Sequence, residues 1–129
     1  MLVVIDTNVL VSAMLSNRSA PRQIIEMVIK GEITPCYDSR IMEEYKDVLY
    51  RPRLHISAEK AGTILDLFEA IGMYADPPAT HLLFTDEDDK AFYETALECG
   101  ATLVTGNAKH FPAEPWILSP AEFLRTIAE

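Results

Sequence analysis

The sequence lacks an apolar run long enough to cross a lipid bilayer. Its longest apolar stretches, Met1–Ile5 and Val9–Leu15, are far shorter than the roughly 20 residues that a membrane-spanning helix needs. The N-terminus has no basic leader, and Asp6 interrupts the apolar run too early for a signal peptide. The two cysteines, Cys36 and Cys99, form no close motif, so no disulfide framework is expected. These absences predict a cytoplasmic protein with reduced thiols and no membrane segment.

Basic residues are also scarce. The chain has 11 Lys and Arg against 20 Asp and Glu, which gives a formal net charge of −9. Residues 1–60 hold eight basic and eight acidic side chains, whereas residues 61–129 hold three basic and twelve acidic ones. This balance argues against tight nonspecific binding of nucleic acid, which depends on neutralising phosphates. It does not exclude a nuclease, because metal ions bound by acidic groups supply positive charge locally.

The 129 residues are enough for one domain, over 1–129, with a single core, and they contain no internal repeat or linker. Strand and helix patterns alternate along the chain. Strands are predicted at Leu2–Ile5, Ile33–Tyr37, Met73–Ala75, Thr102–Thr105 and Trp116–Leu118. Helices are predicted at Asn8–Leu15, Arg22–Lys30, Arg40–Tyr50, Ser57–Gly72, Lys90–Cys99 and Ala121–Ala128. This order predicts an α/β fold in three layers, with a central parallel sheet flanked by helices.

In such a sheet, functional groups gather at the carboxyl ends of the strands. Asp6 directly follows the first predicted strand, and its neighbours Thr7 and Asn8 could orient a carboxylate or a water molecule. Thr105 and Asn107 stand at the end of the fourth predicted strand. Two interpretations of Asp6 stay open: a functional carboxylate, or a cap on the helix that follows.

Glu44 lies in a helix whose inward stripe includes Ile41, Tyr45 and Val48. A glutamate within an apolar stripe costs free energy unless it is paired or liganded. The alternative is a boundary residue whose carboxylate reaches solvent along its own stem. The functional interpretation is favoured because other carboxylates are available to meet Glu44.

The run Asp86-Glu87-Asp88-Asp89 stands at the start of a predicted helix. Acids favour this place because of the helix dipole, but four in succession exceed what capping needs. A divalent cation would relieve their repulsion, and hard oxygen ligands suit Mg²⁺ or Mn²⁺ better than zinc. The run lacks the glycine and the ligand spacing of an EF-hand loop.

Four motifs in the expected order resemble the PIN-domain family, and most closely its VapC-like branch of bacterial and archaeal toxins. They are Ile-Asp6-Thr7-Asn8-Val-Leu, Ser39-Arg-Ile-Met-Glu-Glu44-Tyr-Lys-Asp-Val-Leu-Tyr-Arg-Pro, Asp86-Glu-Asp-Asp89-Lys-Ala-Phe-Tyr-Glu-Thr-Ala and Leu-Val-Thr105-Gly106-Asn107. The resemblance implies Mg²⁺- or Mn²⁺-dependent cleavage of single-stranded RNA. It also implies a cognate antitoxin protein and a homodimer.

The resemblance carries the family's metal-site carboxylates onto Asp6, Glu44 and Asp89. Asp86 and Asp88 could assist around that site. Many family members have a further acid where this chain has Asn107, so a second bound metal is in doubt. Thr7, Thr105 and Asn107 would position water or phosphate by hydrogen bonds. Among the arginines of the first half, the two that flank Pro52 are the best candidates for holding the RNA backbone: Arg51 and Arg53.

Two other functions are compatible with parts of the pattern. A catalytically weak or inactive module with the same fold would bind RNA or protein, and Asn107 and the net charge of −9 support it. A metal-dependent phosphatase or phosphotransfer domain would also place aspartates after parallel strands. A dehalogenase-type phosphatase needs Asp-x-Asp after the first strand, and here Asn8 takes the second place.

Overall fold

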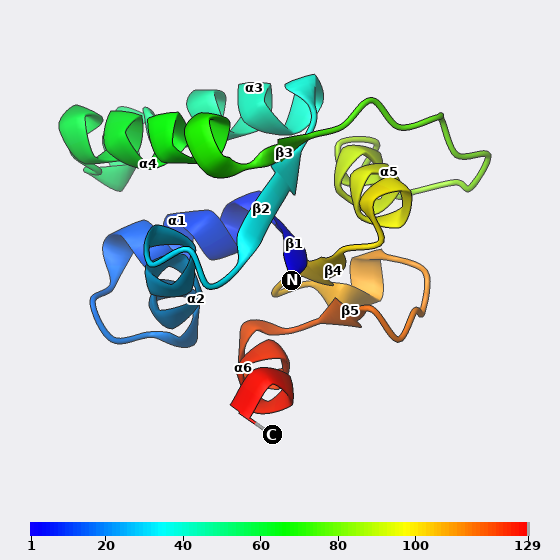
Figure 1. Cartoon of the computed structure of the whole chain (residues 1–129). Coiled ribbons are helices and arrows are strands. Elements are labelled where there is room, and N and C mark those ends of the chain that lie inside the picture. Colours follow the sequence, from blue (N-terminus) through cyan, green and yellow to red (C-terminus); the bar gives the residue numbers. More distant parts are fainter. Residues whose placement is uncertain (129) are drawn as a thin grey trace.

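The computed structural model describes residues 1–128 and contains one sheet of five parallel strands (Figure 1). The strands are β1 (Leu2–Ile5), β2 (Thr34–Tyr37), β3 (Met73–Tyr74), β4 (Thr102–Val104) and β5 (Ile117–Leu118). The helices are α1 (Thr7–Leu15), α2 (Ala20–Ile29), α3 (Ser39–Leu49), α4 (Ala58–Ile71), α5 (Asp89–Cys99) and α6 (Pro120–Ala128). Two short 3₁₀ turns are η1 (Pro52–Leu54) and η2 (Ala108–His110). The predicted elements are all present, with ends that move by one or two residues.

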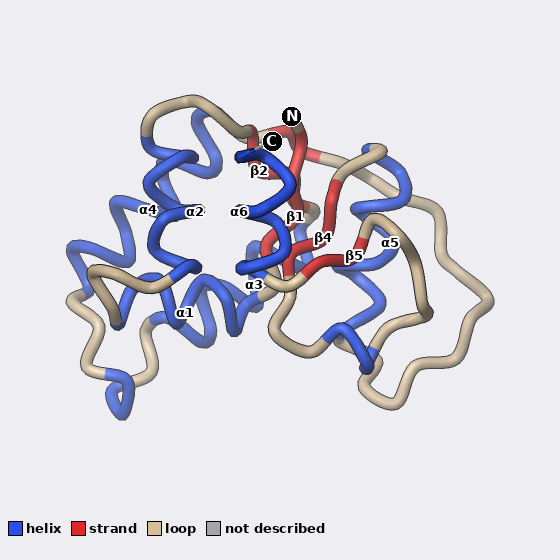
Figure 2. The backbone as a smooth tube through the Cα atoms, turned by 90° about the horizontal axis from the view of Figure 1, so that it is seen from below, coloured by secondary structure: helices blue, strands red, loops and turns tan. Residues whose placement is uncertain are grey.

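The helices cover both faces of the sheet. Helices α3, α4 and α5 lie on one face, and α2 and α6 pack together on the other (Figures 1 and 2). Helix α1 packs against both α2 and α3. The predicted three-layer α/β fold is therefore confirmed. Within residues 1–128, no helix combines the length and the apolar character needed to cross a membrane.

Local capping explains where several helices begin. The Ser19 hydroxyl accepts a hydrogen bond from the Arg22 N–H at the start of α2. Asp38 caps the start of α3, because its Oδ1 accepts from the Ile41 N–H at 2.8 Å. Such caps satisfy N–H groups that have no partner inside the helix.

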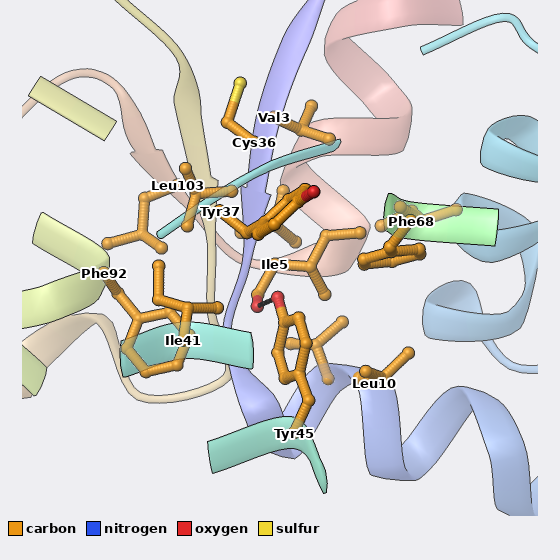
Figure 3. Close-up of a cluster of buried hydrophobic side chains, with 14 of the residues drawn as sticks. Val3, Ile5, Leu10, Cys36, Tyr37, Ile41, Tyr45, Phe68, Phe92 and Leu103 are labelled. Atoms are coloured by element: carbon orange, nitrogen blue, oxygen red, sulfur yellow. Dashed lines mark hydrogen bonds between the residues drawn. The ribbon is translucent and has the colours of Figure 1, made fainter. Parts of the chain in front are cut away.

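Strand β1 is the centre of the core. Its residues Val3, Val4 and Ile5 are fully buried, as expected for a parallel strand that is covered on both faces. Tyr45 of α3 is also fully buried, and its hydroxyl donates to the Ile5 carbonyl (Figure 3). The Tyr45 ring packs edge-on against Phe68 with ring centres 5.8 Å apart. These contacts seat α3 on the carboxyl end of β1.

Gly72 allows α4 to turn directly into β3. A Cβ atom at this position would lie 2.3 Å from the Phe68 carbonyl oxygen and 2.7 Å from the Pro35 carbonyl oxygen. Only glycine can therefore bring the end of α4 this close to β2.

The strand order β3-β2-β1-β4-β5 places the two neighbours of β1 far apart in the sequence. The chain builds outward from β1 to β2 and β3, then crosses back to β4 and β5. The point between β1 and β4 is thus a topological switch point, where open α/β sheets bind their ligands. The residues that follow these two strands are Asp6 and Thr105.

Candidate functional site

Asp6 is held at the switch point by both its backbone and its side chain. Its N–H donates to the Val104 carbonyl at 3.0 Å, which extends the pairing of β1 with β4. Its carboxylate is 6% exposed, and its Oδ2 accepts from the Thr105 hydroxyl at 2.6 Å. The carboxylate makes no capping bond to α1. Asp6 thus stands at the N-cap position of α1, but its carboxylate is bonded to Thr105 and makes no capping bond to the helix.

Thr105 connects Asp6 to the loop after β4. Its buried hydroxyl donates to Asp6 and accepts from the Asn107 backbone N–H at 3.0 Å. Because the hydroxyl proton is directed at Asp6, the loop and the carboxylate are oriented together. Asn107 enters this arrangement through its backbone, and its side chain is half-buried.

Glu44 approaches the same place from α3. Its neighbours Ile41 and Tyr45 are fully buried, while Glu44 is half-buried and its Oε2 accepts from the Thr7 hydroxyl. Thr7 is the first residue of α1 and directly follows Asp6. Glu44 is therefore turned toward the end of β1, which contradicts the alternative of a carboxylate that simply reaches solvent.

The acidic run forms the turn before α5. Asp86 accepts from the Asp88 N–H at 3.0 Å through its side chain, and from the Asp89 N–H at 3.1 Å through its carbonyl. Asp88 makes no side-chain capping bond to α5. Asp89 is half-buried, whereas Asp86 and Asp88 are exposed. Local turn formation accounts for Asp86, but it gives no partner to the Asp89 carboxylate.

These residues line one cavity of about 290 Å³, which we call the carboxylate cavity. Its lining residues are Asp6, Thr7, Asn8, Val11, Glu44, Val48, Arg51, Arg53, Leu54, Asp86 and Asp89. A second cavity of about 420 Å³ shares Glu44, Val48 and Arg51 with it and also includes Asp88. The fold thus brings most of the predicted site residues together. Thr105 and Asn107 are not lining residues and lie behind Asp6.

The carboxylates of this cavity raise one another's pKa values. Burial is the largest cause for Asp6, Glu44 and Asp89, and it raises all three pKa values. For Asp89, the negative charges of Asp6 and Asp86 add to burial, and its pKa reaches about 6. The charge of Asp6 likewise raises the pKa of Glu44. His110 opposes this trend, because its positive form lowers the pKa of Asp6 and of Asp89.

This donor set fits a hard divalent cation. Its ligands would be carboxylate oxygens, and none of Asp6, Glu44 and Asp89 forms a salt bridge within residues 1–128. In that same part of the chain, no three Asp, Glu, His or Cys side chains already form a ligand cluster. Asp6 is directed to Thr105 and Glu44 to Thr7. Binding an ion would therefore require these side chains to turn toward a common point.

An ionic network that the sequence analysis did not anticipate stands beside the cavity. Arg40 of α3 pairs with Asp38 and with Glu94 of α5, each at 2.7 Å. Glu94 is buried and also accepts from the Thr80 N–H, which fixes the long segment before α5. The network therefore joins the helix that carries Glu44 to the helix that begins at Asp89. One signal was present: Glu94 interrupts the apolar run of α5, as Glu44 does in α3.

Comparisons with known proteins agree with the fold. Residues 2–109 match the family described as the PIN domain. An uncharacterized protein of Methanocaldococcus jannaschii is 28% identical over 108 residues, which cover 81% of this chain and 70% of that protein. The fold is similar to a chain in the crystal structure of VapBC2 from Rickettsia felis bound to a DNA fragment from their promoter. The TM-score is 0.62 at 24% identity, and the match covers 92% of this chain and 98% of that chain. The chain therefore belongs to the PIN-domain family, whose members are generally nucleases.

Proposed function

We propose that this chain, as a single unit over residues 1–129, is a Mg²⁺- or Mn²⁺-dependent endoribonuclease that cleaves single-stranded RNA. One observation carries the proposal: Asp6, Glu44 and Asp89 meet in one cavity at the switch point, from three elements of a PIN fold. Their raised pKa values reflect a concentration of negative charge that a divalent cation would relieve.

In this proposal Asp6, Glu44 and Asp89 hold the ion. When bound, the ion neutralises charge on the scissile phosphate and activates the attacking water. Thr105 keeps the Asp6 carboxylate oriented through its hydrogen bond. Thr7 holds Glu44 close to Asp6, and it can release Glu44 by rotating its hydroxyl. Asn107 and Asn8 offer amide groups for positioning water or phosphate, and Asp86 and Asp88 supplement the negative charge around the ion.

The biological setting is part of the same proposal. The similarity to a VapBC2 chain supports a role as the toxin of a toxin–antitoxin pair, with a cognate antitoxin as partner. A homodimer and a cytoplasmic location follow from the family resemblance and from the sparse cysteines. The family match favours this class over the phosphatase and phosphotransfer alternatives.

A second function has specific support. A catalytically weak or inactive PIN module that binds RNA or protein fits the amide of Asn107 and the net charge of −9. The two functions differ in whether the carboxylates bind an ion and whether RNA is cut.

The test compares the wild type with Asp6→Asn on single-stranded RNAs in Mg²⁺, in Mn²⁺ and in EDTA. We expect metal-dependent cleavage by the wild type and a loss of about 100-fold or more in Asp6→Asn, since removing one electrostatic group commonly costs that much. Asp66→Asn on the exposed face of α4 is the matched control and should cleave normally. No cleavage by pure wild type in either metal, with no ion bound in calorimetry, would support the binding module.

A further inference from the structure

Most arginines of the first half of the chain are already engaged with acids. Arg22 pairs with Glu26 at 2.8 Å, and Arg40 pairs with Asp38 and Glu94. Of the two arginines in the wall of the carboxylate cavity, Arg51 pairs with Asp47 at 2.7 Å. The other is Arg53, which forms no salt bridge within residues 1–128.

Arg53 is therefore the unengaged guanidinium of the cavity. It is exposed, and it lines the same cavity as Asp6, Glu44 and Asp89. It does not line the neighbouring cavity, which Arg51 shares. An arginine free of intramolecular partners can offer its planar fork of N–H donors to an external anion.

The backbone around Arg53 forms a closed turn. Pro52 restricts the turn η1, and the Leu54 N–H and the His55 N–H close it through the Arg51 and Pro52 carbonyls at 3.0 and 3.1 Å. His55 ends the turn in the left-handed region with φ of 55°, the one non-glycine residue of the described chain with a positive φ. A non-glycine residue in this region is uncommon and persists only where its surroundings enforce it. The half-buried Leu54 anchors the turn in the cavity wall.

We propose that Arg53 binds a backbone phosphate of the substrate strand at the edge of the carboxylate cavity. The inference rests on the proposed function. The chain has a net charge of −9 and would hold a polyanion next to a cluster of acids. Distant charges are screened by salt, so a cation at the cavity affects RNA affinity more than the net charge does. The closed turn η1 already sets the backbone conformation of Arg53, so engaging the phosphate orders mainly its side chain. Arg51 contributes less, because its guanidinium is shared with Asp47.

The experiment measures binding of a short fluorescent single-stranded RNA with 2′-O-methyl groups, in Ca²⁺, across a series of salt concentrations. The variants are Arg53→Gln and Arg53→Lys, with Arg125→Gln as the matched control. Arg125 is an exposed arginine in α6 that forms no salt bridge within residues 1–128. Circular dichroism and thermal unfolding show that each variant is folded.

We expect Arg53→Gln to weaken binding about tenfold, as for the loss of one charge-assisted hydrogen-bonded contact. The slope of log affinity against log salt should fall in magnitude by about 0.7, the value for one phosphate of a single strand. Arg53→Lys should restore the slope and part of the affinity, while Arg125→Gln should match the wild type. On a cleavable RNA, KM should rise in Arg53→Gln while kcat stays within about twofold, because the contact forms equally in the ground and transition states.

Arg53→Gln with the affinity and salt slope of the wild type would overturn the inference and leave the proposed nuclease function standing. An equal loss in Arg125→Gln would overturn it too, since the effect would then be one of overall charge. If the wild type neither binds nor cleaves any single-stranded RNA, the proposed function fails, and the role of Arg53 fails with it.

Discussion

Thr105 shows how one buried hydroxyl can orient a functional carboxylate. It is fully buried, donates to Asp6 at 2.6 Å and accepts from the Asn107 N–H at 3.0 Å. With these bonds made, the hydroxyl proton is directed at Oδ2 of Asp6 while the hydroxyl oxygen binds the Asn107 N–H. Hydrogen-bond partners behind a metal ligand commonly change affinity or activity by about 10- to 100-fold.

Thr105→Val keeps the shape of the side chain and removes the hydroxyl. We expect cleavage and metal affinity to fall about tenfold, because Asp6 loses the donor that orients it. Unfolding free energy should fall by about 1–2 kcal/mol, because the Asn107 N–H and Asp6 lose a partner. Thr105→Ser is the control: it loses a buried methyl group and about 1 kcal/mol, yet it should retain cleavage. Equal cleavage by the Val and Ser variants would show that the hydroxyl has no positioning role.

Helix α3 carries Glu44 and helix α5 begins at Asp89, and an ion pair between Arg40 and Glu94 links the two helices. Arg40 bridges Asp38 at the start of α3 to Glu94 in the middle of α5. The Glu94 and Asp38 side chains are buried, while Arg40 is about half exposed at 47%. Removing Glu94 leaves Arg40 half exposed and still paired with Asp38, so the cost comes from the lost bonds to Arg40 and to the Thr80 N–H.

We therefore expect Glu94→Ala to lower the unfolding free energy by about 2 kcal/mol, below the range for fully buried pairs because Arg40 stays solvated. Divalent metal affinity should fall as well, because α3 and α5 lose their ion pair and the Thr80 N–H loses its acceptor. The control is Glu98→Ala, one turn further along α5 and exposed, which should change stability by less than about 0.5 kcal/mol. Urea unfolding and calorimetry with Mn²⁺ measure both quantities. Unchanged stability in Glu94→Ala would show that the network contributes nothing.

At the scale of the whole molecule, the carboxylate cavity makes the free energy of unfolding depend on pH and on divalent cations. The folded state raises the pKa of Asp89 from an ordinary 3.8 to about 6, and burial also raises those of Asp6 and Glu44. Between these two pH values the folded chain binds more protons than the unfolded chain. The stability contributed by these groups therefore falls as pH rises from about 4 to about 6.

Comparison of the wild type with Asp89→Asn isolates this effect. In EDTA, the two proteins should have similar stability well below pH 3.8, since Asp89 is then protonated in both the folded and the unfolded state. At pH 7, Asp89→Asn should be more stable by about 1 kcal/mol, after discounting the shift for solvent screening. Adding Mg²⁺ at pH 7 should stabilise the wild type by about 1.4 kcal/mol when the Mg²⁺ concentration is ten times its dissociation constant. The difference in stability between the wild type and Asp89→Asn should then become smaller.

Asp66→Asn on α4 is the control for this series and should follow the wild type at every pH. Urea unfolding at several pH values, with and without Mg²⁺, gives the comparison. A wild type that equals Asp89→Asn at pH 7 in EDTA, or that gains nothing from Mg²⁺, would contradict the electrostatic description of the cavity.

The order and type of the elements could be predicted from the sequence, because their signals are local. The apolar run of β1, the caps at Ser19 and Ser57 and the glycine at Gly100 each act within a few residues. The signals for Asp6, which follows a buried strand, and for Glu44, which interrupts an apolar stripe, are also local. In the structure Glu44 is half-buried and bonded to Thr7, as its place in that stripe indicates. Residue propensity and apolar periodicity indicate which segments are helices or strands and which of their faces are buried. They were therefore sufficient to predict the α/β class and the candidate carboxylates.

Only the tertiary structure decided which of these groups meet, because the decisive contacts join distant parts of the chain. Thr105 and Asp6 are separated by 99 positions, and Arg40 and Glu94 by 54. The strand order that places β4 beside β1 is what brings Thr105 to Asp6. The i,i+4 spacing of Asp47 and Arg51 is a local signal for their ion pair, but only the folded chain shows that Arg53 lines the same cavity as the carboxylates. The sequence by itself determined the helices, the strands and the candidate carboxylates. The packing of strands and helices around β1 determined which of these carboxylates line one cavity.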